Sequence, residues 1–332
     1  MTLLSVTTTG ARTPKPAVVL ELLKPITWFA PMWAFGCGVV SAGVPVDVPR
    51  LIVGIILTGP LVCAASQAVT DWFDRHVDAI NEPDRPIPSG RLPGRWGLYV
   101  AFLWTGLSLL AATLLGVWGF VATVIGLALA WAYSAPPFRL KRDGWIGNAA
   151  VGACYEGLPW FTGAAVMLGS LPDARIIALA VLYSVGAHGI MTLNDFKSIE
   201  GDRQLGLASI PARRGARPAA ILACVVMAGS QAVVIALLLW WGLMIAAAIV
   251  AALLLAQFVL MRRLIAEPKA RAAWYNATGT TLYVIGMMVC AVGLANAPDA
   301  AVAVDAAAVV DAASAVGAVD TVDLAVTAEI RA

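Results

Sequence analysis

Charged residues are scarce in this chain of 332 residues, because Asp, Glu, Lys and Arg make up 13% of it and hydrophobic residues 60%. The mean hydropathy is +0.83. A soluble globular protein carries roughly a quarter charged residues, so the composition excludes a soluble enzyme and indicates an integral membrane protein surrounded by the lipid bilayer. The net charge of +2 is small, and we expect no nucleic-acid partner.

Cysteine and histidine are also sparse, with five cysteines and two histidines in the whole chain. No two cysteines form a CxxC pair, which argues against a disulfide framework and against a thiolate zinc site. Each lies singly in an apolar segment and is typical of a small buried hydrophobic residue. The five are Cys37, Cys63, Cys154, Cys224 and Cys290.

Long apolar segments are abundant instead, and most are close to the roughly 20 residues that cross a bilayer as a helix. They predict an all-α polytopic membrane helical bundle with about nine transmembrane helices. We expect a cytoplasmic tail over 1–17, a transmembrane domain over 18–296, and a low-complexity, disordered tail over 297–332. The apolar segments lie at about 26–43, 51–71, 97–115, 117–134, 146–169, 175–194, 218–238, 240–261 and 274–296.

The distribution of positive charge predicts the orientation of these segments. With nine spans and the N-terminus inside, 19 of the 22 Lys and Arg residues fall on the cytoplasmic side, and only Arg50, Arg175 and Arg331 fall outside. Such an excess is the positive-inside pattern. We therefore expect a cytoplasmic N-terminus and an extracytoplasmic C-terminus.

Two acidic motifs lie on the predicted cytoplasmic side. The first, Thr70–Asp78, carries aspartates at i, i+3 and i+7, which share one face of a helix. The second, Asn194–Asp202, repeats the pattern, except that Ser198 stands where the first motif has its middle aspartate. Repelling carboxylates kept together in this way indicate a cation between them. The five candidate metal ligands and catalytic residues are Asp71, Asp74, Asp78, Asp195 and Asp202.

Magnesium binds through one or two carboxylates together with phosphate oxygens. Two facing acidic motifs therefore predict a clamp for Mg²⁺ or Mn²⁺ and a diphosphate, with nearby cations neutralising the remaining charge. The alternative is that these are solvated charges at helix ends, and the basic group after the fourth span fits plain positive-inside topology equally well. The candidate diphosphate-binding residues are Arg85, Arg139, Lys141, Lys197 and Arg203.

Two further ionisable residues lie within predicted spans. Glu156 is a carboxylate well inside a predicted helix, and an acid there costs about 2.5–3.5 kcal/mol on insertion scales. His188 lies seven residues before Asp195, on the same helical face and two turns deeper. We expect both in an acceptor cavity, where His188 could ligate the metal of a porphyrin-like substrate. The alternatives are a hydrogen-bonded packing acid and a core histidine.

The motifs and their flanks resemble the UbiA superfamily of membrane prenyltransferases, in its chlorophyll and bacteriochlorophyll synthase branch. The resemblance covers roughly 18–296 and rests on the Asp71–Asp78 spacing, on the Ile-Asn-Glu-Pro-x-Arg-Pro-Ile-Pro-Ser-Gly flank, and on Asn-Asp-Phe-Lys-Ser-Ile-Glu-Gly-Asp-Arg-Gln-Leu-Gly-Leu. Thr70 departs from the usual Asn, and Ser198 stands where many relatives outside the branch have Asp.

The resemblance implies the UbiA-type helical fold and transfer of a C20 prenyl group, geranylgeranyl or phytyl, from its diphosphate. The implied acceptor is the propionate carboxylate of bacteriochlorophyllide, with Mg²⁺ assisting and diphosphate released. The alternatives are a prenyltransferase with another acceptor (chlorophyllide, a quinone precursor or haem) and a transporter that uses Glu156 and His188 as a proton relay. Carboxylates clustered at one membrane face, and not at the midplane, argue against transport.

Overall fold

The computed structural model describes residues 13–204 and 206–297. Of the expected tails, 1–17 and 297–332, residues 1–12 and 298–332 fall outside this part, so the expected disorder of the second tail stays a prediction. Within the described residues every regular element is a helix, and the one extended pairing is an isolated bridge between Asp143 and Ala208. This confirms the all-α class.

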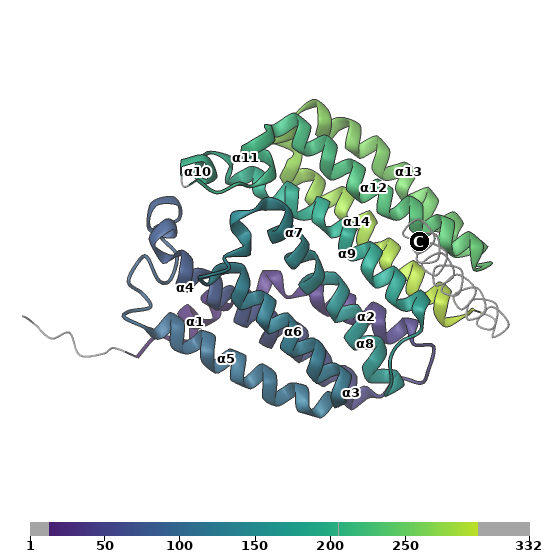
Figure 1. Ribbon diagram of the computed structural model, residues 1–332, viewed down its shortest axis with the longest axis horizontal. Helices are drawn as coiled ribbons and strands as arrows, with labels where there is room; N and C mark the ends of the chain where they lie inside the picture. Colours follow the sequence, from purple (N-terminus) through teal and green to yellow (C-terminus); the bar gives the residue numbers. More distant parts are fainter. Residues whose placement is uncertain (1–12, 205, 298–332) are drawn as a thin grey trace, which may run out of the picture.

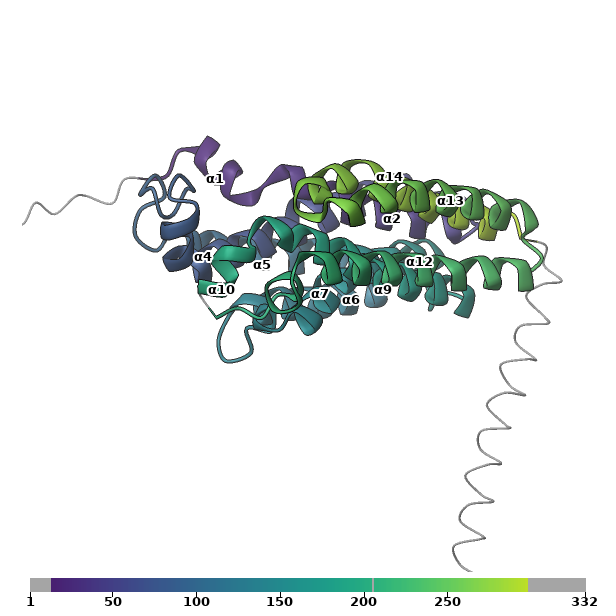
Figure 2. The ribbon, with the colours of Figure 1, turned by 90° about the horizontal axis from the view of Figure 1, so that it is seen from above.

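Long helices build an elongated bundle whose loops gather at its two ends (Figures 1 and 2). Pro60 lies in a π-helical turn, Leu57–Cys63, that joins α3 to α4. A second π turn, Ala153–Gly157, joins α7 to α8. The long helices are α2 (Phe29–Ser41), α3 (Val48–Ile56), α4 (Ala64–Asn81), α5 (Trp96–Ala112), α6 (Gly116–Ser134), α7 (Gly144–Gly152), α8 (Leu158–Leu168), α9 (Ala174–Asn194), α12 (Ala216–Trp240), α13 (Met244–Ala266) and α14 (Pro268–Ala295), and the short ones are α1 (Pro16–Leu23), α10 (Ile199–Gln204) and α11 (Ile210–Arg214).

By length and hydropathy, six helical segments of the described residues can cross a membrane, or seven if the bent pair Pro16–Thr27 and Phe29–Ser41 counts as one span. One of the six, Trp96–Ser134, folds back on itself. The rings of Phe102 and Trp131 lie 4.9 Å apart, whereas residues 29 positions apart on one straight helix would be separated by about 43 Å. Gly116, at φ 77°, makes the reversal. The predicted number of nine is therefore approximate, although α5 and α6 are separate helices.

Helix α9 lies at the centre, packed against α7, α12 and α14. Helices α2 and α8 approach so closely that a Cβ on Gly38 would lie 2.0 Å from the carbonyl oxygen of Trp160, which is small-residue packing as found between membrane helices. The outward faces are apolar, with Ile245 80% and Leu255 65% exposed. A bundle of this kind is a multi-pass membrane protein.

Both acidic motifs lie at the same end of this bundle, on the left in Figure 2, where α4 and α9 end and α10 and α11 follow. The same end carries every described Lys and Arg except Arg50 and Arg175, which lie at the starts of α3 and α9 at the opposite end. The segregation of charge expected from the sequence is thus present in the folded chain.

Candidate functional site

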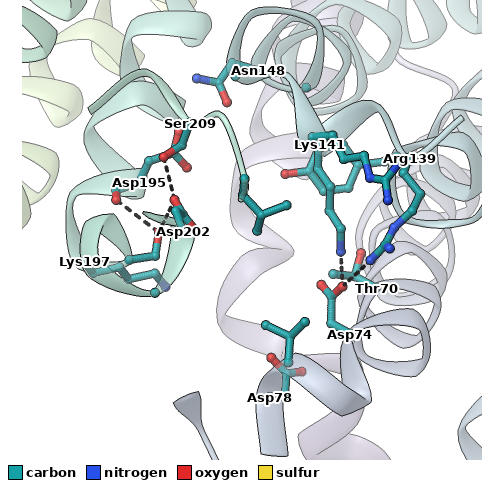
Figure 3. A pocket seen from close by; sticks show the side chains of 18 of the residues that line it. Thr70, Asp74, Asp78, Arg139, Lys141, Asn148, Asp195, Lys197, Asp202 and Ser209 are labelled. Carbon is teal, nitrogen blue, oxygen red and sulfur yellow. Dashed lines mark hydrogen bonds and ion pairs between the residues drawn. The ribbon is translucent and has the colours of Figure 1, made fainter. Parts of the chain in front are cut away.

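A polar cavity of about 860 Å³ lies between the end of α4 and the segment that follows α9. The two acidic motifs form opposite walls, and their side chains point toward the space between them (Figure 3). Asp74 and Asp78 line one wall, while Asp195 and Asp202 line the other. The structure therefore brings together four of the five predicted carboxylates.

The first motif lies on α4, and each of its aspartates is paired with a cation. Asp74 forms ion pairs with Lys141 and, at 4.0 Å, with Arg139. Asp78 Oδ2 accepts a hydrogen bond from Arg85 Nη1 at 2.8 Å. In the absence of a ligand, this wall is electrically balanced by its own neighbours.

Asp71 occupies a different place from its two partners. Its side chain is buried and does not line the cavity. Oδ1 accepts hydrogen bonds from Lys24 Nζ at 2.7 Å and Arg85 Nη1 at 3.4 Å, while Oδ2 is enclosed without a partner. The helix does place Asp71 and Asp78 on one face, since Arg85 contacts both, but Asp71 stands behind the wall and orients the cations.

The second motif has a different local structure. Asp195 begins a short 3₁₀ turn, and Asp202 lies on α10. Hydroxyl groups contact Asp202 Oδ2, with Ser209 Oγ donating at 2.5 Å and Ser198 Oγ at 3.1 Å. Neither aspartate takes part in an ion pair within the described part of the chain. The second wall is therefore negative and not balanced by a paired cation.

Four of the five predicted diphosphate-binding cations line the cavity: Arg85, Arg139, Lys141 and Lys197. Arg203 does not, because its Nε donates to the carbonyl oxygen of Ala212 at 3.2 Å and its Nη1 lies 3.7 Å from Glu200. Burial lowers the pKa of Lys141, with the adjacent Asp74 acting in the opposite direction. Burial likewise acts to lower the pKa of Arg85, but the surrounding carboxylates outweigh it and raise that pKa.

The backbone beside the cavity joins its two walls. The amide of Gly144 donates to the carbonyl of Ala208 at 3.1 Å, and the amide of Ala208 donates to that of Arg142 at 3.0 Å. A Cβ on Gly144 would lie 2.8 Å from the backbone nitrogen of Ile210, so only glycine allows this approach. These bonds connect the segment that carries Lys141 to the segment that follows Asp202.

Asp143 caps the start of α7. Its Oδ1 accepts hydrogen bonds from the amides of Trp145 at 2.8 Å and Ile146 at 3.1 Å. These amides lower the pKa of the Asp143 carboxyl group, as expected for an N-cap. The cap fixes the point where the loop carrying Lys141 enters the helix.

The chemistry of the donors fits a hard divalent cation. Oxygen ligands stand on both walls, and Mg²⁺ needs only one or two carboxylates when phosphate oxygens supply further ligands. No group of three or more His, Cys, Asp or Glu side chains is close enough in residues 13–204 and 206–297 to hold a metal ion alone. The enclosed, unpartnered Oδ2 of Asp71 is a further oxygen behind the first wall. The arrangement suits a metal that arrives together with an anionic ligand.

Several residues at this site were not predicted from the sequence. Lys24, Tyr133, Asn148 and Ser209 all line the cavity. Asn148 Nδ2 donates to Thr192 Oγ1 at 3.2 Å, which connects α7 to α9. None of the four belongs to a charge pattern near the motifs. Two of them lie near predicted residues in the sequence: Ser209 follows Asp202 by seven residues, and Tyr133 begins the Tyr-Ser-x-Pro-Pro run before Arg139.

Glu156 and His188 do not share a cavity. Glu156 lines an apolar cavity of about 410 Å³ together with residues of α2, α9 and α14. His188 lines a separate apolar cavity of about 490 Å³, where its ring lies 5.0 Å from that of Trp145. Both ring nitrogens of His188 are enclosed without a hydrogen-bond partner. The structure thus places the two residues in different cavities, and the expected role of each in binding the acceptor stays a prediction.

An all-helical membrane bundle with opposed carboxylates and cations at one end can hold a divalent metal together with a phosphorylated ligand. Residues 29–283 match the UbiA prenyltransferase family. The chain belongs to this family, and it is a prenyl-transferring enzyme.

Two curated relatives match over nearly their whole length. The chain is 58% identical over 283 residues to the bacteriochlorophyll synthase 33 kDa chain of Cereibacter sphaeroides, covering 85% of this chain and 94% of the relative. It is 54% identical over 286 residues to the protein of the same name from Rhodobacter capsulatus, with the same coverage. Among solved structures, a UbiA homolog from Archaeoglobus fulgidus bound to GPP and Mg²⁺ has the same fold, with a TM-score of 0.59, 20% identity, and 84% of this chain and 98% of that chain covered.

Proposed function

We propose that this protein is a bacteriochlorophyll synthase. It transfers a C20 prenyl group, from geranylgeranyl or phytyl diphosphate, to the propionate carboxylate of bacteriochlorophyllide and releases diphosphate. The observation that carries the choice of acceptor is the identity of 58% to a bacteriochlorophyll synthase chain over 94% of that relative. The polar cavity with opposed carboxylates supports the use of a diphosphate donor.

Asp74, Asp78, Asp195 and Asp202 are the residues that would hold Mg²⁺, with Mn²⁺ as a substitute. The archaeal UbiA homolog bound to GPP and Mg²⁺ supports the use of a divalent metal. Bound Mg²⁺ would supply Lewis-acid stabilisation of negative charge on the diphosphate. Asp71 has a supporting role in this proposal, because it holds Lys24 and Arg85 in place from behind the wall.

The cations of the first wall provide the remaining stabilisation. Arg85, Arg139 and Lys141, with Lys197 from the opposite wall, contact diphosphate oxygens as the allylic C–O bond breaks. Contacts to charge that develops in the transition state accelerate the reaction more than they tighten ground-state binding. The acceptor carboxylate forms the new C–O bond, and it needs no general base, since it is already ionised at neutral pH.

The proposed domain boundaries are 18 and 296, and the proposed orientation places the site in the cytoplasm. The charge distribution between the two ends of the bundle supports this orientation. Accessibility tags after Gly90 and after Arg214 should react only from the cytoplasmic side, and a tag at the C-terminus only from outside. A cytoplasmic C-terminus would contradict the orientation and the number of spans.

The function is tested by product extraction from membranes that contain the full chain. With geranylgeranyl diphosphate, bacteriochlorophyllide and Mg²⁺, the expected product is the prenyl ester, and a chelator should abolish it. Chlorophyllide, a quinone precursor and haem are supplied in parallel as competing acceptors. Recovery of unesterified bacteriochlorophyllide, together with prenylation of another acceptor, would overturn the proposal.

A further inference from the structure

A second cavity, of about 410 Å³, lies among the helices of the bundle, next to the end of α9 where the second acidic motif begins. It is bounded by α2, α9, α14 and the π turn Ala153–Gly157, and α2 and α14 lie side by side in Figure 2. Asn276 lines it and donates to Asn194 Oδ1 at 2.7 Å. Since Asn194 directly precedes Asp195, this cavity and the polar cavity are neighbours along α9.

The polar side chains that line this cavity are satisfied by the protein, with one exception. Tyr155 Oη accepts from Gln67 at 3.0 Å, and Trp33 Nε1 donates to the carbonyl of Val284 at 3.0 Å. Thr280 and Thr281 donate to Asn276 and Ala277 within α14. Glu156 is 5% exposed, and it forms no hydrogen bond or ion pair within the described residues.

An unpartnered carboxyl group in an apolar cavity is costly, and such residues inside membrane proteins mark ligand sites by default. The π turn that carries Glu156 is a distortion frequently found at functional sites. A hydrocarbon prenyl chain would leave the acid unpaired, whereas a ligand with a polar atom on an apolar body would satisfy it. Phe29 and Trp33, whose rings stack at 5.7 Å, supply a flat aromatic wall.

We propose that this cavity receives the tetrapyrrole acceptor and that the Glu156 carboxyl group donates a hydrogen bond to a carbonyl group on the rim of the macrocycle. The inference rests on the proposed function. A planar pigment with ring ketone or acetyl groups has apolar faces that match the lining of this cavity. Its polar edge carries carbonyl oxygens that would accept a hydrogen bond from Glu156. Because this cavity borders Asn194, the propionate arm of a pigment bound there would be directed toward the second acidic motif.

His188 takes no part in this arrangement, although it lies next to Ala187, which lines the Glu156 cavity. The cavity beside His188 includes α12 but neither α2 nor α14. The two cavities therefore have different linings, with α12 beside His188 and with α2 and α14 beside Glu156. The Glu156 cavity is favoured as the acceptor site because Asn276, which lines it, is hydrogen-bonded to Asn194 at the start of the second acidic motif.

The test combines vibrational spectroscopy with kinetics on the full chain in membranes or detergent. Bacteriochlorophyllide bound to the wild type should show a carbonyl stretch shifted to lower frequency, as expected for a hydrogen-bonded ketone. Glu156→Gln keeps a donor and should retain the shift. Glu156→Leu should lose it and raise the apparent KM for the pigment about tenfold, the usual effect of one hydrogen bond, while leaving the KM for the prenyl diphosphate unchanged.

Two controls separate this role from general packing. Thr281→Val alters the same cavity but removes a hydroxyl bonded to its own helix, so it should leave the carbonyl stretch in place. A pigment whose ring ketone is reduced to an alcohol should bind the wild type more weakly than the ketone does. Glu156→Leu should bind the alcohol and the ketone equally well. A retained shift in Glu156→Leu, or equal increases in both KM values, would overturn the inference alone. Failure of the wild type to esterify bacteriochlorophyllide would overturn the proposed function as well.

Discussion

The two acidic motifs have similar spacing in the sequence but different surroundings in the folded chain. On α4, the carboxylates of the first motif are paired with Lys24, Arg85, Arg139 and Lys141. In the second, Asp202 is contacted by two serine hydroxyls, and neither aspartate is paired with a cation in the described residues. Equal spacing therefore does not imply an equal electrostatic role.

The difference indicates a division of labour across the cavity. The first wall holds cations next to carboxylates, so it can both bind a metal and release Lys and Arg to a diphosphate. The second wall offers two carboxylates that form no ion pair within the described residues, and it also carries Lys197, so a cation that enters the cavity would compensate charge mainly on this side. We therefore expect substitutions in the second motif to weaken mainly the binding of the metal. Substitutions in the first motif should weaken the binding of both the metal and the diphosphate.

The largest effect is expected for Asp202→Asn. Loss of this charge removes one of the proposed metal ligands, and turnover should fall by at least about 100-fold. Glu200→Gln, on the same helix, is the matched control, because Glu200 is 68% exposed on its side chain and pairs at the surface with Lys269. Initial rates of ester formation measure both. Near-normal turnover in Asp202→Asn at ordinary Mg²⁺ would contradict the assignment.

Asp74→Asn should have a similar effect, because its carboxylate is the one shared by Lys141 and Arg139. Membrane insertion should be unaffected, since the partners of Asp74 belong to the site. If the first wall mainly binds diphosphate through its cations, added Mg²⁺ should restore none of the lost rate. Rates across a Mg²⁺ titration, with the amount of inserted protein measured alongside, distinguish lost catalysis from lost protein.

Lys141→Met makes the first wall more like the second, because Asp74 then keeps only Arg139 at 4.0 Å. We expect kcat/KM for the prenyl diphosphate to fall roughly 10-fold to 100-fold, since a partly buried charge contact is lost. Arg139→Ala should cost about tenfold, because its contact is longer. Arg91→Ala, whose side chain pairs with Glu21 at 2.5 Å outside the cavity, is the control. Equal costs for all three variants would point to bulk charge and not to position.

His188→Phe should change the apparent KM of either substrate by no more than about twofold. The phenyl ring keeps the stacking on Trp145, and the nitrogens that it replaces have no partner. Substrate titrations against this variant and Glu156→Leu compare the two buried groups directly. A selective rise in the pigment KM of His188→Phe would make His188 a pigment ligand.

The smallest effect concerns stability. Asp143→Ala removes the cap of α7 and should cost about 1 kcal/mol of the free energy of unfolding, which thermal unfolding in detergent can measure. Because the pKa of Asp143 is lowered in the folded state, its contribution is complete above the ordinary carboxylate pKa of about 4 and is lost as the pH falls through the lowered value. Identical stabilities for variant and wild type at neutral pH would contradict the capping role.

The spans and the acidic motifs were predictable because their signals are local. Apolar runs mark helices, and the spacing of Asp71 and Asp78 places them on one face, where Arg85 contacts both. The orientation of Arg203 could also have been anticipated, since a helix turns successive side chains by about 100° and Arg203 follows Asp202. Lys24 reaches the site only because α1 packs against α4, and no local pattern indicates this contact.

The cavities that Glu156 and His188 line could likewise not be predicted from the sequence. Both lie in segments composed mainly of apolar and small residues, so periodicity assigns no preferred face. The packing of α9 against α7, α12 and α14 decides which residues share a cavity. Ala187 and His188, adjacent in the chain, therefore line different cavities.

The pair of backbone hydrogen bonds at Ala208 has a consequence for protein engineering. The spacing of the two walls is set there by main-chain atoms, which a change of side chain does not alter. The cavity around Glu156 lies apart from this connection. Libraries aimed at new acceptor pigments should therefore vary Phe29, Trp33 and Glu156, and leave the segments 141–144 and 206–210 untouched as the fixed part of the scaffold.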